Sequence, residues 1–196
     1  MSEKELNCEK HGAYKAKIIR LAGRERATPC PECHKLQKAK EDQARRAEIL
    51  ERDRQARYTR ASLPKRFVGR TLENWTARTP DQLRVLEEIA DFFRDPKASV
   101  SDGRSYAFIG GCGTGKTHLA VGMIRALIDA GFTAKYANVP EAIARVKATY
   151  GANRTESEEQ VIESFTSPDL LVLDEVGVQF GTETENLVLF RILNRR

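Results

Sequence analysis

Long apolar runs are absent from this 196-residue sequence, and their absence sets the first limits on its function. No segment approaches the ~20 consecutive apolar residues that a membrane-spanning helix needs. The N-terminus, Met-Ser-Glu-Lys-Glu, also lacks the apolar core of a secretory signal peptide. We therefore expect a cytoplasmic protein with no membrane partner. A hydrophobic content of 40% is enough to bury the core of a globular domain.

Cysteine and histidine are scarce, but most of them gather near the N-terminus. Three of the four cysteines and two of the three histidines lie in residues 1–34. There, Cys8-x-x-His11 and Cys30-Pro-Glu-Cys33 form two short-spaced pairs, which an intervening hairpin would bring together around a tetrahedral zinc ion. We predict that residues 1–34 are a small, loop-rich zinc-binding unit.

Two alternatives to this ligand set stay open. A disulfide is the poorer one, because thiols stay reduced in the cytosol. His34 is an alternative ligand to His11, although its position next to Cys33 makes simultaneous ligation awkward. Units below ~40 residues seldom fold without a metal or disulfides, which gives residues 1–34 a physical reason to bind zinc.

Charge is unevenly distributed along the chain. Residues 1–66 hold 18 Lys and Arg against 10 Asp and Glu, whereas residues 67–196 hold 15 against 18. A basic N-terminal third next to a near-neutral body suggests an arm that contacts nucleic acid or an acidic protein surface. The alternative is a solvated basic surface with no partner.

Residues 35–62 form the predicted connector between the zinc-binding unit and the remaining domain, residues 63–196. Residues 35–61 contain no Gly or Pro and are rich in Ala, Glu, Gln, Lys and Arg, which favours a helix. Apolar residues are few, so we expect an exposed connector or partner-binding helix that ends at Leu63-Pro64.

The segment from Tyr106 to Thr117 is the most informative part of the chain. A strand pattern, Tyr106-Ala-Phe-Ile109, leads into a complete G-x-x-x-x-G-K-[ST] phosphate loop at 110–117, followed by a predicted helix at 116–130. Glycine lets the backbone N–H groups point inward at phosphate oxygens, and the start of the helix favours an anion. The expected nucleotide-binding residues are Gly110, Gly111, Cys112, Gly113, Thr114, Gly115, Lys116, Thr117 and His118.

Within this loop, Lys116 supplies a charge for the β- and γ-phosphates, and Thr117 supplies a hydroxyl for Mg²⁺. The alternative is a chance glycine-rich turn, but the loop lies in the strand-to-helix context that the motif requires. The loop therefore predicts binding of a nucleoside triphosphate.

The rest of the domain has the pattern of a parallel α/β protein. Helices are expected at 80–94, 140–150, 161–165 and 183–195, and strands at 133–137 and 169–174. The second strand, Asp169-Leu-Leu-Val-Leu-Asp174, is a continuous apolar run, as in a strand buried on both faces of a sheet.

Two acids end this strand and complete the predicted site. We assign Asp174, with Thr117, to Mg²⁺ binding, and Glu175 to activation of an attacking water, so that Glu175 and Lys116 are the candidate catalytic residues. The alternative for Glu175 is a solvated acid at the start of a helix.

These segments resemble the DnaC-type helicase loaders, which are AAA+ ATPases related to DnaA initiators and to IstB-type transposition helpers. The resemblance covers roughly residues 62–196. Its most specific parts are Gly-Lys-Thr-His-Leu-Ala after Thr114 and Asp-Glu-Val-Gly-Val-Gln179, which leads to Asn194-Arg-Arg. It implies a P-loop NTPase of AAA+ type with a three-layer αβα parallel sheet.

The same resemblance implies a role in DNA replication: ATP-controlled delivery of a replicative helicase to single-stranded DNA, with self-association through the AAA+ domain. In the family, a sensor strand and an arginine-finger region follow the point where this sequence ends, at Arg196. We therefore expect a sheet that is incomplete at its C-terminal end. Loss of an arginine finger costs ~10³ to 10⁵ in rate, so hydrolysis is left open. Two alternatives remain, a transposition helper and a zinc-dependent adaptor that binds ATP without hydrolysing it.

Overall fold

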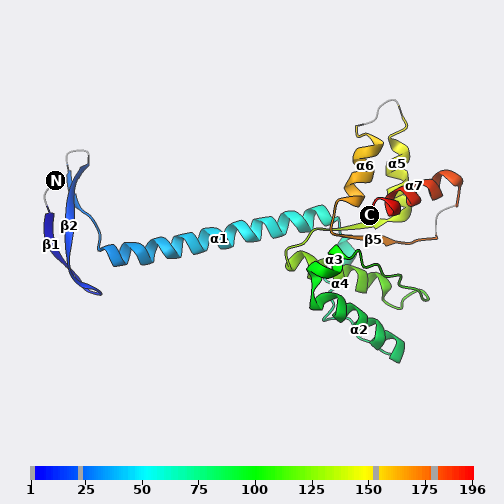
Figure 1. The fold of residues 1–196 in the computed structure, drawn as a ribbon, viewed down its shortest axis with the longest axis horizontal. Helices are drawn as coiled ribbons and strands as arrows, with labels where there is room; N and C mark the ends of the chain where they lie inside the picture. Colours follow the sequence, from blue (N-terminus) through cyan, green and yellow to red (C-terminus); the bar gives the residue numbers. More distant parts are fainter. Residues whose placement is uncertain (1–2, 22–23, 152–154, 178–180) are drawn as a thin grey trace. The chain divides into compact units, whose positions relative to one another are not determined.

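The computed structural model describes residues 3–21, 24–151, 155–177 and 181–196. The chain divides into two compact units, Met1–Asp53 and Arg54–Arg196. The boundary falls inside a single helix, α1 (Pro31–Ala61), so the last two turns of α1 belong with the second unit (Figure 1). Domain boundaries at 34/35 and 62/63 stay predictions.

The part of the first unit that precedes α1 is built from β-strands, and the prediction of a loop-rich segment was wrong. Strands β1 (Glu3–Cys8), β2 (Gly12–Leu21) and β3 (Arg24–Ala27) form an antiparallel sheet in the order β1-β2-β3. The expected hairpin between the two ligand pairs is present, formed by β2 and β3. Tyr14, Ala16 and Ile18 alternate with lysines along β2, which is the period-two signal of a strand.

Helix α1 begins at Pro31, four residues before the expected start, and ends at Ala61, just before Leu63-Pro64 as predicted. Its apolar residues Leu36, Ile49 and Leu50 are exposed, which confirms the expectation of an exposed helix for this part. Ala61, by contrast, is fully buried. It packs with residues of helix α4 (Lys116–Asp129) in one of the apolar clusters of the second unit.

The second unit has helices on both faces of a parallel sheet. Strands β4 (Ala134–Asn138) and β5 (Leu170–Asp174) pair in parallel, and α5 (Val139–Ala148) and α6 (Glu158–Thr166) connect them. Leu171 and Leu173 pack against α5, α6 and α7 (Glu183–Asn194), whereas Val172 packs on the opposite face with α4. This alternation gives the expected parallel sheet between two helical layers.

The remaining helices follow their sequence signals closely. The 3₁₀ turn η1 (Lys65–Phe67) follows Pro64, and α2 (Pro80–Arg94) and α3 (Pro96–Ser101) complete the second unit. The Thr79 hydroxyl accepts the N–H of Gln82 to cap α2, and Pro80 at the first helical position fits its fixed φ. Within the described residues, no helix combines the length and apolarity that crossing a bilayer requires.

Two expectations about the sheet were wrong. Residues 106–109 are not a strand, although their sequence has the pattern of one, and every residue of β5 is half-buried rather than buried. Both differences have one physical reason. A strand needs a neighbour for its hydrogen-bond ladder, and in the described part of the chain β5 pairs only with β4 while 106–109 pairs with no strand.

Candidate functional site

The phosphate loop, residues 110–117, leads directly into α4. Gly113 and Gly115 have φ angles of 78° and 90°, in the left-handed region that side chains disfavour. Gly115 is the N-cap of α4 and has no side chain to cap the first N–H groups. Those groups and the positive end of the helix dipole are therefore available to an anion, as the sequence predicted.

Lys116 and Thr114 contact the loop itself. The Lys116 Nζ donates to the carbonyls of Gly110 and Gly111 at 2.8 and 2.7 Å, and the Thr114 hydroxyl donates to Gly111 at 2.9 Å. Cys112 is exposed. The ammonium group thus lies over the loop that is expected to hold phosphate oxygens.

Two residues 57 positions apart in the sequence meet beside this loop. The Thr117 hydroxyl donates to Asp174 Oδ2 at 2.9 Å, so the two predicted Mg²⁺ residues lie together. The pairing of β4 with β5 adds a residue that sequence reasoning missed: the Tyr136 hydroxyl donates to the same Oδ2 at 2.7 Å. Burial, followed by the contact with Asp174, raises the pKa of Tyr136, which keeps its hydroxyl protonated as a donor.

Glu175 follows Asp174 in a conformation that is rare for its residue type. Its φ is 60°, and its N–H donates to Asp174 Oδ1 at 3.0 Å. Its carboxylate accepts a hydrogen bond from Asn138 Nδ2 at 2.5 Å, a second contact that the sequence did not reveal. Asn138 and Asp174 are Cα partners in the ladder, so this register is the signal that would have found it.

A strap, residues 68–75, lies along α4 and holds it on one side. An ideal Cβ on Gly115 would lie 2.3 Å from Trp75 Nε1, and one on Gly122 would lie 2.8 Å from Leu72, so both side chains pack directly on helix backbone. Leu72 and Trp75 thus form an apolar anchor. The anchor packs against the phosphate loop at Gly115 and against the middle of α4 at Gly122.

Two polar side chains of α4 also bind the strap. The His118 Nε2 lies 2.9 Å from the Thr71 carbonyl and 2.7 Å from Asn74 Oδ1. Arg125 Nη1 donates to the Val68 carbonyl at 2.6 Å. The role of His118 in nucleotide binding stays a prediction, and the structure shows its ring nitrogen engaged with the strap.

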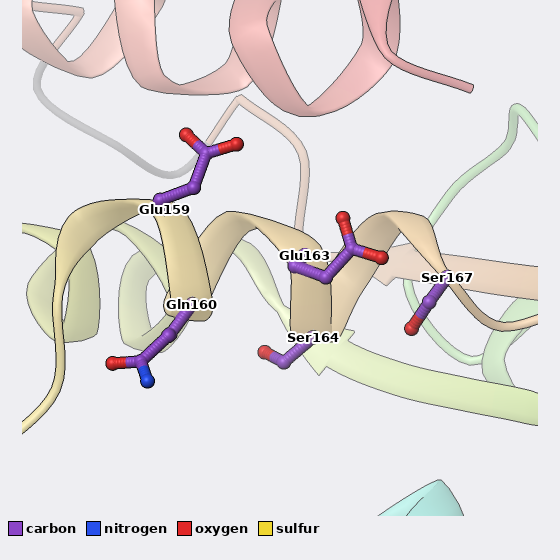
Figure 2. Close-up of a pocket in the computed structure, with 5 residues that line it drawn as sticks. All are labelled: Glu159, Gln160, Glu163, Ser164 and Ser167. Atoms are coloured by element: carbon purple, nitrogen blue, oxygen red, sulfur yellow. The ribbon is translucent and has the colours of Figure 1, made fainter.

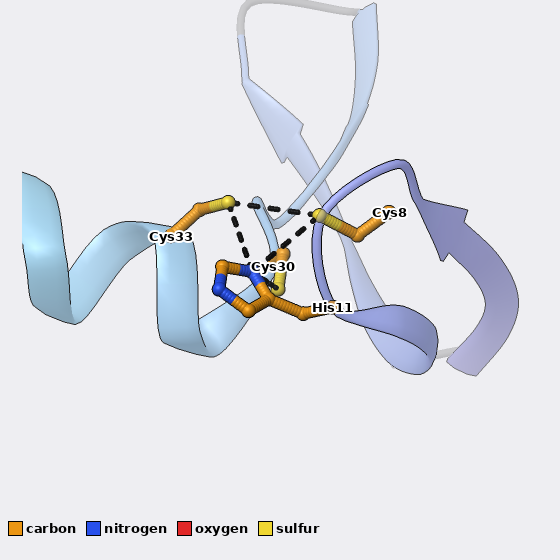
Figure 3. A group of neighbouring side chains, drawn as sticks. All are labelled: Cys8, His11, Cys30 and Cys33. Carbon is orange, nitrogen blue, oxygen red and sulfur yellow. Dashed lines mark hydrogen bonds between the residues drawn. The ribbon is translucent and has the colours of Figure 1, made fainter.

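The second candidate site lies in the first unit, where four side chains converge (Figure 3). The ligand atoms of Cys8, His11, Cys30 and Cys33 all lie within 4.8 Å of one another. Cys8 and His11 flank the β1–β2 turn, Cys30 precedes α1, and Cys33 lies in its first turn. The structure thus brings together the four predicted ligands, with His11 rather than His34 in the group.

The spacing of these atoms fits a tetrahedral zinc ion. The His11 Nδ1 lies 3.4 to 3.7 Å from the three sulfur atoms, and the sulfurs of Cys8 and Cys33 lie 3.6 Å apart. Bonds of about 2.3 Å to sulfur and about 2.0 Å to nitrogen put neighbouring ligands about 3.5 to 3.8 Å apart in a tetrahedron. The donor set and its geometry therefore suit zinc.

The local electrostatics favour a thiolate in this cluster. Hydrogen bonds from the Lys10 backbone N–H and then from His11 lower the pKa of Cys8 to about 6. Cys33, which shares a hydrogen bond with Cys8, has its pKa raised to about 11. One thiolate is thus already stabilised by the turn, and a coordinating metal deprotonates the remaining thiols.

A surface hollow on α6 belongs to neither cluster (Figure 2). It is lined by Glu159, Gln160, Glu163, Ser164 and Ser167. Arg195 donates to the Glu159 carboxylate at 2.5 Å, so this acid already has a cationic partner. No residue of the phosphate loop lines the hollow, and we assign it no ligand.

The chain is similar to a known protein family and to curated bacterial proteins. The family profile described as "IstB-like ATP binding protein" matches residues 38–196. The replicative helicase loader DnaC of Escherichia coli (strain K12) is 28% identical over 162 residues, which cover 80% of this chain and 64% of that protein. DnaC of Buchnera aphidicola subsp. Baizongia pistaciae (strain Bp) is 33% identical over 137 residues, covering 70% and 54%.

The chain therefore spans less than two thirds of the length of these curated relatives. The crystal structure of the DnaC helicase loader matches it with a TM-score of 0.60 at 23% identity, covering 68% of this chain and 73% of that one. This likeness shows that the chain shares the fold of that loader, in agreement with the expected parallel α/β fold. Val178 and Gln179, two of the residues on which the sequence resemblance was based, lie outside the described residues.

Proposed function

Because this chain belongs to the family of IstB-like ATP binding proteins, we propose that it binds ATP and Mg²⁺ at residues 110–117 and acts as a loader of a replicative helicase. The observation that carries the nucleotide site is the 2.9 Å contact between Thr117 and Asp174. It places the hydroxyl of the phosphate loop beside the carboxylate at the end of β5. A chance glycine-rich turn would give no reason for these two side chains to meet.

Each group of the site has a distinct task in this proposal. The loop N–H groups and Lys116 bind the phosphates, and Thr117 and Asp174 hold Mg²⁺, which neutralises phosphate charge. Glu175 is the candidate base for an attacking water, and the hydrogen bond from Asn138 fixes where its carboxylate lies. The chemistry of the site is thus phosphoryl transfer to water, with Asn138 restraining the base.

Binding and turnover can be tested separately. Lys116→Ala is expected to abolish binding of a fluorescent ATP analogue, whereas Glu175→Gln should keep the affinity and lower any measured ATP turnover about 10²- to 10⁴-fold. Equal turnover by the wild type and the Glu175→Gln variant would refute a catalytic role for Glu175. The protein would then act as an ATP-binding switch.

The helicase partner is proposed from the relatives, which are named replicative helicase loaders. The test is capture from host lysate with and without ATP and Mg²⁺, with the captured proteins identified by mass spectrometry. Recovery of a replicative helicase supports the proposal. Recovery of a transposase instead would favour a transposition helper, the second candidate function, because the family profile carries the IstB description.

Single-stranded DNA is the proposed nucleic-acid partner of the basic N-terminal third. Affinity for an oligonucleotide should fall steeply as salt is added, because each neutralised phosphate releases counterions. Affinity that is absent, or insensitive to salt, would contradict this part of the proposal.

Zinc is the proposed ligand of Cys8, His11, Cys30 and Cys33, since their spacing and donor types suit a tetrahedral site. Metal analysis of the purified chain should give one zinc per protein. Substitution of Cys112, which lies outside the cluster, is the matched control and should leave the zinc content unchanged. A metal-free protein with four reactive thiols would overturn the assignment.

A further inference from the structure

Among the described residues, three groups donate to the Asp174 carboxylate. Its Oδ2 accepts from the Thr117 and Tyr136 hydroxyls at 2.9 and 2.7 Å, and its Oδ1 accepts the Glu175 N–H at 3.0 Å. An ionised carboxylate offers about four acceptor positions. The described donors therefore occupy both positions of Oδ2 and leave one position, on Oδ1, for a further donor such as a water molecule.

The donor that fixes this arrangement most firmly is Tyr136. Tyr136 is only 6% exposed, and it packs with Val121 and Ile124 of α4 in an apolar cluster. The ring cannot move without disturbing that cluster, so the hydroxyl is held in place on β4. Thr117 contacts the same oxygen, but it belongs to the phosphate loop and is itself a proposed Mg²⁺ residue.

We propose that Tyr136 is a positioning residue that orients Asp174 for the divalent cation and so sets the Mg²⁺ concentration the site requires. This inference rests on the proposed function, because it needs ATP and Mg²⁺ at this loop. With the hydroxyl in place, Oδ2 is fully occupied and the free position of Oδ1 has a fixed direction. Without it, Oδ2 keeps only the Thr117 hydroxyl, its second position is left to solvent, and the carboxylate is held less firmly.

The test removes this hydroxyl alone. In the full chain, Tyr136→Phe keeps the buried ring and deletes the donor to Asp174. Binding of N-methylanthraniloyl-ATP is followed by energy transfer from Trp75, the only tryptophan, whose indole packs on Gly115 of the loop. Affinity is measured first in EDTA, and the Mg²⁺ dependence of binding is then titrated at a fixed concentration of analogue.

We expect the Mg²⁺ midpoint of Tyr136→Phe to rise roughly tenfold, the scale seen when a group that orients a metal ligand is lost. Affinity in EDTA should match the wild type. Tyr58→Phe is the matched control, because the Tyr58 hydroxyl also donates to an aspartate, Asp129, at 2.9 Å. Asp129 lies about 18 Å along α4 from Thr117, so this variant should leave the Mg²⁺ midpoint unchanged.

The outcomes separate this inference from the proposed function. An unchanged Mg²⁺ midpoint in Tyr136→Phe overturns the inference, and so does an equal loss of affinity in EDTA and in Mg²⁺, which would indicate general damage to the site. A rise of the same size in Tyr58→Phe also overturns it. If the wild type binds no nucleotide under either condition, the proposed function fails and the inference fails with it.

Discussion

The two units hold their candidate sites by different physical means. In the first unit, only Ala16 and Cys30 are buried among residues 3–20 and 24–53, the part for which burial is described. In the second unit, three apolar clusters pack around the sheet and α4. A site in a unit without an apolar core depends on its ligand for folding, whereas a site built on a core exists before its ligand binds. Zinc is thus expected to be structural in the first unit, and ATP to be a reversible ligand in the second.

The largest expected effect is the loss of zinc from the first unit. Cys30→Ser should abolish zinc binding and unfold the β1–β3 sheet, because structural zinc contributes roughly 10–16 kcal/mol in small zinc domains. Amide hydrogen exchange in the full chain would show lost protection in β1, β2 and β3. ATP affinity should stay at its wild-type value, and a parallel loss of ATP binding would show that the two units do not fold independently.

The second largest expected effect is a loss of stability when the core of the second unit is altered. Trp75 is 9% exposed and packs on Gly115, so Trp75→Ala should lower the free energy of unfolding of this unit by about 3–5 kcal/mol. Urea denaturation measures it, with zinc content as a check that the first unit is intact. Phe190→Ala is the matched control, since Phe190 is 61% exposed and should cost under about 0.5 kcal/mol. Similar losses in both variants would contradict the packing described for Trp75.

The smallest effect concerns a single carboxylate of the second unit. Lys147, which donates to Glu185 at 3.0 Å, lowers the pKa of Glu185 below its ordinary value of 4.5. A lowered pKa in the folded state stabilises the protein above pH 4.5, and this contribution is lost as pH falls through the folded-state pKa. Glu185→Gln should therefore lower the unfolding midpoint near pH 7 and converge with the wild type in acid.

Glu159→Gln is the control for this pH effect. Glu159 also has a lowered pKa, owing to Arg195, but its side chain is 61% exposed against 8% for Glu185. Solvent screens the exposed pair, so its substitution should change the midpoint less. A larger fall of the unfolding midpoint in Glu159→Gln than in Glu185→Gln would show that the Arg195–Glu159 pair is the more stabilising one.

The sequence predicted features whose signals are local. Thr79 before Pro80 marks the start of a helix through a contact that spans three residues. The phosphate loop is equally local, because its glycines and Lys116 act within one turn. The chain's own short-range chemistry was enough to place these elements to within a few residues.

Features that depend on distant partners could not be predicted in the same way. Tyr136 and Asn138 become site residues only through the register of β4 against β5, which brings them to Asp174 and Glu175. The extended pattern at 106–109 likewise needs a neighbouring strand to become part of a sheet. The alternating residues of β2 did carry a strand signal, but the clustered cysteines and prolines favoured a loop-rich interpretation.

The left-handed backbone of Glu175 has a consequence for the evolution of this site. At φ 60° a Glu side chain costs of order 1–3 kcal/mol, which glycine would recover. Selection for stability alone would therefore remove the carboxylate from this position. We expect Glu175→Gly to unfold at a higher denaturant concentration than the wild type and to lose ATP turnover. That result would show that the protein keeps an unfavourable backbone conformation because its chemistry requires the carboxylate. Stability and function would then be traded against each other at a single residue.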